Sequence, residues 1–188
     1  MAIGWLDELR KKEVKSGILR LDTEIHDDSS SSFMMELLET ERLGNKEIKI
    51  WLTSPGGSAF HAFTIFDALE DYKSRGNGVE IVACGVAASA AAMIILQAAT
   101  VRTATPNTRF LLHEIRQITG ENTTFTKSDL EDQGEELKAL NSMILEVLSR
   151  RTGKSKNDIE SFFSRRDRWL GSKQAKDWGL IDRILGDE

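Results

Sequence analysis

The chain has 188 residues, of which 40% are hydrophobic and 29% are charged. This length suits one domain, since a chain of this size buries roughly 70% of the surface that its unfolded form exposes. One cysteine excludes an internal disulfide, and three histidines without a Cys-x-x-Cys or His-Glu-x-x-His motif give no ground for a zinc site. The formal net charge of −5 argues against nonspecific binding of nucleic acid.

Two segments bear on targeting. Residues 81–101 carry no charge and are long enough to suggest a membrane span. They are rich in alanine and interrupted by polar residues, which lowers the transfer energy, so we predict a buried strand, a turn and a core helix. The first ten residues are too acidic for a signal peptide. We therefore expect a cytoplasmic protein with no membrane partner.

The chain begins with a predicted amphipathic helix in residues 1–16, followed by a strand in residues 17–21. The apolar side of this helix carries Trp5, Leu6 and Leu9. Residues 29–32 are four serines after two aspartates, which is typical of a loop that ends in a helix N-cap. The apolar residues in 33–38 predict the helix that follows.

Short apolar runs alternate with a helical pattern in the next part of the chain. The runs at residues 48–52, 79–83 and 110–112 predict strands. Between the first two, apolar side chains from Ala62 to Tyr72 recur at helical spacing. Strands that alternate with helices predict an α/β fold with a largely parallel sheet, formed by residues 17–188 as a single domain.

A long helix is predicted from Ser128 to about Arg150. Ser128 and Glu131 form a capping-box pattern, in which each side chain can accept a hydrogen bond from the other residue's free backbone N–H. Apolar residues at steps of three, four and seven then continue for about six turns. One apolar stripe opposite a polar face indicates that this helix either covers the domain or projects toward a partner.

A proline-glycine turn follows the predicted strand at 48–52. Pro55 and Gly56 suit the two corners of a tight turn. Gly57 then brings a backbone N–H to the carboxyl edge of the sheet, where it can bind an anion or a developing oxyanion. On this motif alone, an ordinary strand-to-helix turn is the simpler explanation.

Ser89 is a lone hydroxyl among small residues in the run Gly-Val-Ala-Ala-Ser-Ala-Ala-Ala. Small neighbours leave room for a substrate beside the hydroxyl, but a serine here is also a common helix N-cap. The Gly-x-Ser-x-Gly elbow of α/β-hydrolases is excluded, because Ala87 and Ala91 occupy the glycine positions.

Two of the three histidines and one aspartate are candidates for proton transfer. His113 ends the predicted strand at 110–112, where it is either a general base or a hydrogen-bonded core residue. His61 follows the glycine pair by one helical turn and competes for the same role, whereas His26 is expected on the surface. Asp167 lies among three arginines, a cluster that is either a solvated patch or the setting of a functional carboxylate.

Together these motifs resemble one family, the proteolytic subunit of the Clp protease. Its members are serine peptidases with the crotonase-like α/β fold, a spiral of repeated β-β-α units with a projecting handle helix. The resemblance extends from about residue 17 to residue 185. Six segments carry it in order: Ser-Pro-Gly-Gly at 54–57, Gly-Val-Ala-Ala-Ser at 85–89, Pro-Asn-Thr-Arg-Phe-Leu-Leu-His at 106–113, Thr-Gly-Lys-Ser at 152–155, Arg-Asp-Arg-Trp-Leu-Gly-Ser at 166–172 and Trp-Gly-Leu-Ile-Asp at 178–182.

The resemblance implies a serine endopeptidase that needs no metal or cofactor. Ser89 would be the nucleophile, His113 the general base and Asp167 the acid that orients the imidazole. The N–H groups of Gly57 and Ala90 would form the oxyanion hole. The handle helix, at about 126–150, would join heptameric rings of a homo-oligomer that encloses the active sites and acts on polypeptides.

Three departures from the family pattern are visible. Ala90 and Ala91 replace the usual Met-Gly or Met-Ala, which makes the pocket wall smaller. Residues 114–120 read Glu-Ile-Arg-Gln-Ile-Thr-Gly instead of Gln-Pro and a glycine-rich strand, so we expect a different substrate-binding edge and ring contact. Residues 1–16 read as a helix rather than the family's axial loop and give no support for docking to a AAA+ unfoldase, as in a stand-alone or phage-type relative.

Two alternative functions remain open. A crotonase-type acyl-CoA or thioester enzyme would share the fold and the oxyanion hole, but it leaves the set of Ser89, His113 and Asp167 unexplained. A non-catalytic ring-forming subunit would assemble normally, but it has no need for all three residues.

Overall fold

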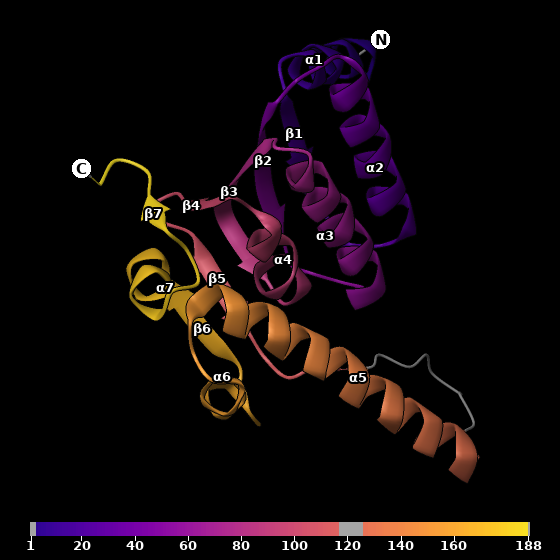
Figure 1. Ribbon diagram of the computed structural model, residues 1–188, viewed down its shortest axis with the longest axis vertical. Helices are drawn as coiled ribbons and strands as arrows, with labels where there is room; N and C mark the ends of the chain where they lie inside the picture. Colours follow the sequence, from indigo (N-terminus) through magenta and orange to yellow (C-terminus); the bar gives the residue numbers. More distant parts are fainter. Residues whose placement is uncertain (1–2, 117–125, 188) are drawn as a thin grey trace.

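The computed structural model describes residues 3–116 and 126–187, and Figure 1 shows the arrangement of its elements. In chain order these are α1 (Ile3–Lys15), β1 (Ile18–Leu21), α2 (Asp27–Arg42), β2 (Glu47–Ser54), α3 (Ala59–Ser74), β3 (Gly78–Ala88), α4 (Ala90–Met93), the 3₁₀ helix η1 (Ile95–Ala98), β4 (Val101–Ala104), β5 (Arg109–Leu112), α5 (Lys127–Thr152), α6 (Lys156–Phe163), β6 (Arg168–Gly171), α7 (Ser172–Trp178) and β7 (Arg183–Ile184). Within the described ranges, no helix has the length and apolar character needed to cross a membrane.

The strands form one seven-stranded sheet. Strands β1, β2, β3, β4 and β7 lie in that order and are parallel; β5 pairs in parallel with the end of β3, and β6 pairs with β5 in the antiparallel direction. The helices α2 and α3 cover one face of this sheet (Figure 1). This architecture confirms the predicted α/β fold with a largely parallel sheet, and it is consistent with the crotonase-like spiral.

Alternation along the strands explains which face of the sheet is covered. In β2, every second residue from Ile48 to Ser54 is buried, and the residues between them are partly exposed. The buried side chains pack against the apolar face of α3, where Ile65 and Leu69 are inaccessible to solvent. All four predicted strands and the predicted helix over residues 62–72 are therefore present.

Strand β3 extends beyond the predicted range of residues 79–83, as far as Ala88. Its register with β2 shifts by two residues after Ala83, and Gly85 lies in this irregularity with a φ of +69°. Residues 86–88 then pair with β5 instead of β4. Gly85, which suggested the end of the strand, instead lies within it. The residues that follow this irregularity belong to the part of the sheet formed with β5.

The start of α2 differs from the prediction. The serines at 29–32 lie inside the helix rather than in a loop, because α2 begins at Asp27 with His26 as its N-cap. The hydroxyl of Ser29 accepts a hydrogen bond from the backbone N–H of His26 at 2.9 Å. Ser30 is buried on the same helix face as Phe33, so this polar-looking run contributes to the packed side of the helix.

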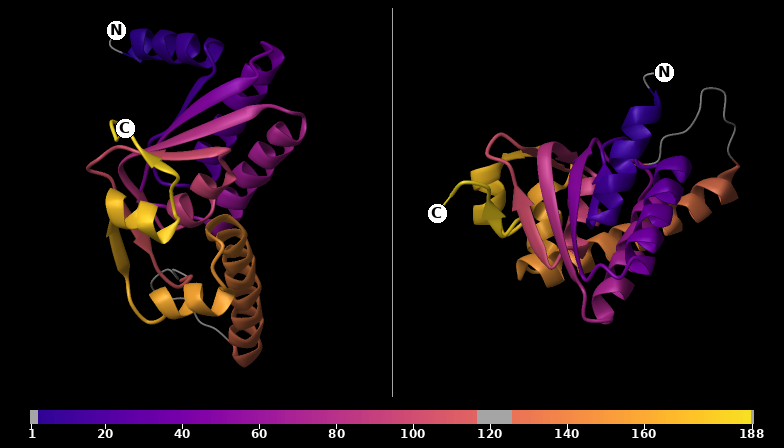
Figure 2. Two further views of the ribbon diagram at one scale, coloured as in Figure 1. Left: turned by 60° about the vertical axis from the view of Figure 1, so that its left-hand side comes forward. Right: turned by 90° about the horizontal axis from the view of Figure 1, so that it is seen from above.

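The start of α5 is also two residues away from the predicted cap. The capping box joins Thr126 and Asp129, whereas Ser128 lies inside the helix and Glu131 does not close a cap. All buried side chains of α5 lie in its second half: Leu140, Ile144, Leu145, Val147 and Leu148. Residues 127–139 have no buried side chain, and both views of Figure 2 show this half reaching beyond the rest of the fold.

Candidate active site

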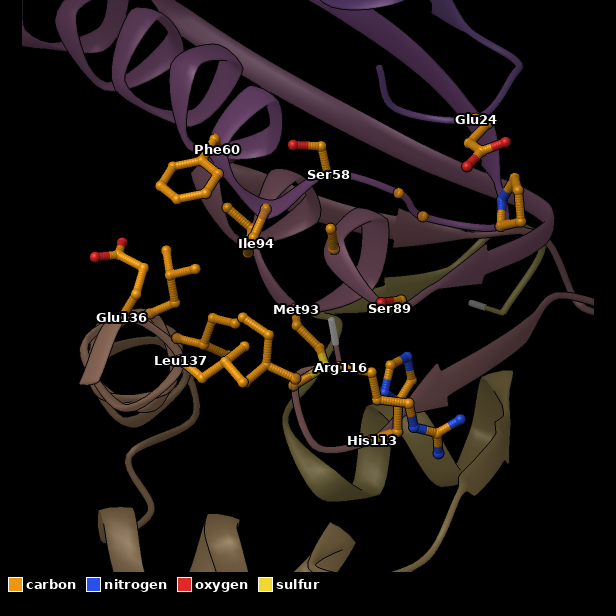
Figure 3. Close-up of a pocket in the computed structure, with 18 of the residues that line it drawn as sticks. Glu24, Ser58, Phe60, Ser89, Met93, Ile94, His113, Arg116, Glu136 and Leu137 are labelled. Atoms are coloured by element: carbon orange, nitrogen blue, oxygen red, sulfur yellow. The ribbon is translucent and has the colours of Figure 1, made fainter. Parts of the chain in front are cut away.

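A pocket of about 690 Å³ lies between the carboxyl end of the sheet and α5 (Figure 3). Four of the five residues singled out by the family resemblance line it: Gly57, Ser89, Ala90 and His113. They come from the turn after β2, the β3–α4 junction and the end of β5. The fifth residue, Asp167, is not part of the lining.

Ser89 occupies a sharp turn between β3 and α4. Its φ of 53° and ψ of −128° place it in a backbone conformation that is rare outside glycine and typically costs about 1–3 kcal/mol. Its N–H donates to the carbonyl oxygen of Leu111 at 2.9 Å, which ties the turn to β5. The nucleophile of α/β-hydrolases sits on a comparably strained strand-to-helix turn. Here the strained turn forms without the two glycines of that motif.

The turn that holds Gly56 and Gly57 passes very close to this junction. A Cβ atom on Gly56 would lie 2.6 Å from the carbonyl oxygen of Ala88 and 2.7 Å from the Cβ of Ser89. A Cβ atom on Gly57 would overlap the carbonyl oxygen of Ile25. Both residues also have positive φ angles, +97° and +140°. Close approach and backbone conformation therefore both require glycine at these two positions.

Two backbone N–H groups beside Ser89 are available to bind an oxygen. Ile25 pairs with the residues on either side of Gly57: its N–H donates to Gly56 at 2.7 Å, and its carbonyl accepts from Ser58 at 2.8 Å. This pairing leaves the N–H of Gly57 without an acceptor in the described part of the chain, and the same holds for the N–H of Ala90. Both residues line the same pocket as Ser89, and two unpaired backbone donors are what an oxyanion hole requires.

His113 follows the last residue of β5 and is half-buried in the pocket wall. Its Nδ1 lies 2.5 Å from the carbonyl oxygen of Glu114. A carbonyl only accepts, so Nδ1 is the donor in this contact, and Nε2 makes no hydrogen bond within the described residues. Within residues 3–116 and 126–187, no hydrogen bond links His113 to either Ser89 or Asp167.

Asp167 immediately precedes β6 and lies outside the pocket. Its carboxylate forms an ion pair with the guanidinium of Arg116, and the two side chains are 42% and 58% exposed. Arg116 itself lines the pocket, three residues after His113. Sequence reasoning missed this contact, although Arg116 lies in the segment where the chain departs from the family pattern. Residues 117–120 of that segment lie outside the described residues.

The competing histidines are elsewhere. His61 lies on α3 and His26 at the exposed N-cap of α2, and neither lines the pocket. Within the two described ranges, no group of three or more His, Cys, Asp or Glu side chains is placed to hold a metal ion. His113 is thus the one histidine that shares the pocket with Ser89.

The rest of the pocket wall is mainly apolar, and its apolar part extends from Ser89 toward α3 and α5. Figure 3 shows Phe60, Ile94 and Leu137 on the side of the pocket away from His113. Two acidic residues, Glu24 and Glu136, also line it. A mainly apolar wall with a few polar groups is typical of a ligand-binding pocket.

Comparisons with known proteins identify the family of the chain. The family model for Clp protease matches residues 6–188. The chain is 35% identical over 171 residues to ATP-dependent Clp protease proteolytic subunit 2 of Corynebacterium jeikeium, which covers 89% of this chain and 78% of the relative. It is 32% identical to proteolytic subunit 3 of Parasynechococcus marenigrum, over 96% of this chain and 88% of the relative. The chain therefore belongs to the Clp protease family and is a serine endopeptidase of that family.

Proposed function

We propose that the chain hydrolyses peptide bonds with Ser89 as the nucleophile, His113 as the general base and Asp167 as the acid that orients the imidazole. The N–H groups of Gly57 and Ala90 stabilise the oxyanion. The observation that carries the proposal is one pocket that combines a serine in a strained turn, a histidine with a free Nε2 and two unpaired backbone donors.

The reaction follows from these positions. Nε2 of His113 takes the proton of the Ser89 hydroxyl as Oγ attacks the carbonyl carbon, and the negative charge on the carbonyl oxygen is held by the two N–H groups. His113 then gives its proton to the leaving amine, and an acyl group stays on Ser89. Water attacks this ester with His113 again as the base, which releases the acid and restores the serine.

Family membership implies a ring-forming oligomer that works with an ATPase partner. We propose more specifically that residues 17–188 act as one domain, that the rings are heptameric and that α5 joins two of them. The exposed first half of α5, which extends away from the fold, supports this role. The cytoplasmic location remains a prediction, and residues 1–16 give no support for docking to a AAA+ unfoldase.

Labelling with a serine-directed phosphonate, read by native mass spectrometry, tests the site and the assembly in one experiment. The wild-type chain should gain one label per subunit, and the ring mass should give the number of subunits. Ser89→Ala should abolish labelling and His113→Ala should reduce it sharply. Ser74→Ala, which changes an exposed serine at the end of α3, is the matched control and should label fully.

Full labelling of the His113→Ala variant would refute the assignment of the base. A monomer at micromolar concentration would contradict the proposed assembly without affecting the assignment of the nucleophile. Hydrolysis of thioesters by unlabelled protein, with no peptidase activity, would favour the acyl-CoA alternative.

A further inference from the structure

The carboxylate expected to orient the general base is bound to another side chain. Nη2 of Arg116 donates to Oδ1 of Asp167, and Arg116 is the only arginine or lysine among the described residues that line the pocket. In the view of Figure 3, the guanidinium of Arg116 and the imidazole of His113 lie at the same end of the pocket. Arg116 thus forms part of the pocket wall and also binds Asp167.

The imidazole also has a different partner. Nδ1 of His113, the atom that a triad acid would bind, lies 2.5 Å from the carbonyl oxygen of Glu114. Nδ1 of His113 and Oδ1 of Asp167 therefore each have another partner, and no hydrogen bond joins the two side chains in the described residues. The imidazole must leave the Glu114 carbonyl, and the carboxylate must turn away from Arg116 toward it, before the acid can orient the base.

We propose that Arg116 is a positioning residue that competes with His113 for the carboxylate of Asp167. This inference rests on the proposed function. While Arg116 holds Asp167, the imidazole is oriented only by the Glu114 carbonyl; when the ion pair opens, the carboxylate is free to accept from Nδ1. Breaking of the Arg116–Asp167 ion pair is therefore a step between the arrangement in this structure and the arrangement that performs catalysis.

The exposure of the pair sets the size of the effect. Both side chains are more than 40% exposed, so solvent screens their attraction and the ion pair biases the equilibrium only modestly. We expect removal of Arg116 to increase the rate of serine acylation about two- to fivefold, which is the bias that an exposed ion pair typically exerts. Arg116 thus slows serine acylation modestly and does not prevent it.

Arg116→Gln tests the inference, with the rate of phosphonate labelling and the kcat and KM for an uncharged peptide as readouts. Labelling and kcat should rise about two- to fivefold, the factor typical of an exposed pair, with little change in KM. Arg116→Lys keeps the charge and should stay near the wild-type rate. Arg42→Gln is the matched control: it removes another exposed arginine–carboxylate pair, Arg42–Glu39, from helix α2, and should leave both rates unchanged.

Two further measurements separate competition from a merely structural role. Asp167→Asn should slow labelling strongly, and adding Arg116→Gln to it should bring no gain, because the arginine then has no carboxylate to withhold. Raised salt should speed the wild type toward the rate of Arg116→Gln and leave the variant unaffected, since salt screens exposed ion pairs.

An Arg116→Gln variant that labels at or below the wild-type rate, in a wild type that labels normally, would overturn this inference and leave the proposed function intact. A gain that persists in the Asp167→Asn background would overturn it as well. A wild-type chain that does not label at all would instead count against the proposed function itself.

Discussion

Gly57→Ala is the sharpest test of the oxyanion hole, because it changes the backbone donor without touching Ser89 or His113. The new Cβ would overlap the carbonyl oxygen of Ile25 and lie 2.9 Å from its nitrogen, and both are backbone atoms that cannot rotate away. The segment must therefore shift, and the N–H of Gly57 shifts with it. Loss of one oxyanion donor typically lowers kcat about 100- to 1,000-fold.

The same substitution also carries a cost in stability that must be separated from the effect on catalysis. At a φ of +140°, alanine is strained, and strain of this kind costs about 1–3 kcal/mol. Gly76→Ala provides the control, since Gly76 has a φ of +82° but nothing within 4 Å of an added Cβ. Denaturant unfolding reports the stability of both variants, and the rate of phosphonate labelling reports acylation.

We expect the Gly76→Ala variant to lose stability but to label at the wild-type rate, and the Gly57→Ala variant to label about 100-fold more slowly or worse while still folded, as expected for a missing oxyanion donor. A folded Gly57→Ala protein that acylates at the wild-type rate would show that the N–H of Gly57 does not bind the oxyanion. The reasoning from close approach would then be wrong.

Two other predictions concern stability. Ser89→Gly should be more stable to denaturant than Ser89→Ala by about 1–2 kcal/mol, because glycine removes the strain of a positive φ; equal stability of the two variants would contradict the strained turn. Burial alone would raise the pKa of Asp182, but hydrogen bonds from Arg102 outweigh it and hold that pKa below its usual value. The stability from this pair is therefore present above the ordinary pKa of an aspartate, about 3.9, and is lost as the pH falls through the lower pKa of the folded state. Asp182→Asn should cost about 2–3 kcal/mol at pH 7, less than for a fully buried pair because Asp182 is 38% exposed, and its cost should shrink in acid. A cost that does not change with pH would refute the assignment.

The positions of the candidate site residues were predictable because of how parallel sheets are built. The strands before Gly57, Ser89 and His113 were each recognisable as apolar runs, and the carboxyl ends of parallel strands meet at one edge. Residues that follow such strands therefore lie near one another in the fold, although the sequence analysis placed only Gly57 at this edge. The lining of one pocket by all three follows from this rule.

The wrong helix starts had local causes that the sequence alone does not resolve. Thr126 and Asp129 have the same spacing and chemistry as Ser128 and Glu131, so two capping boxes overlap in the sequence. The structure uses the earlier one, which adds two residues to the helix. In α2, the burial of Ser30 depends on tertiary packing, which a serine-rich composition does not reveal.

The pair formed by Arg116 and Asp167 was beyond sequence reasoning for a different reason. The two residues are 51 positions apart, and neither belongs to a periodic pattern that fixes its direction. Their contact depends on where β6 brings the segment that precedes it, next to the end of β5. Only the antiparallel pairing of these two strands places them together.

The pairing of Ala88 with Leu111 has a consequence for how this enzyme can change over time. Ser89 comes one residue after this pair and His113 two residues after it, so their separation depends on strand register rather than on loop length. The connection at 105–108 is itself fixed to β3, because Thr108 is buried and its hydroxyl donates to the carbonyl oxygen of Ala83 at 3.0 Å. A single residue inserted into β5 would turn its following side chains to the opposite face and remove the base from the pocket. Substitutions in the pocket wall are thus compatible with this register, whereas insertions or deletions at the ends of the two paired strands are not.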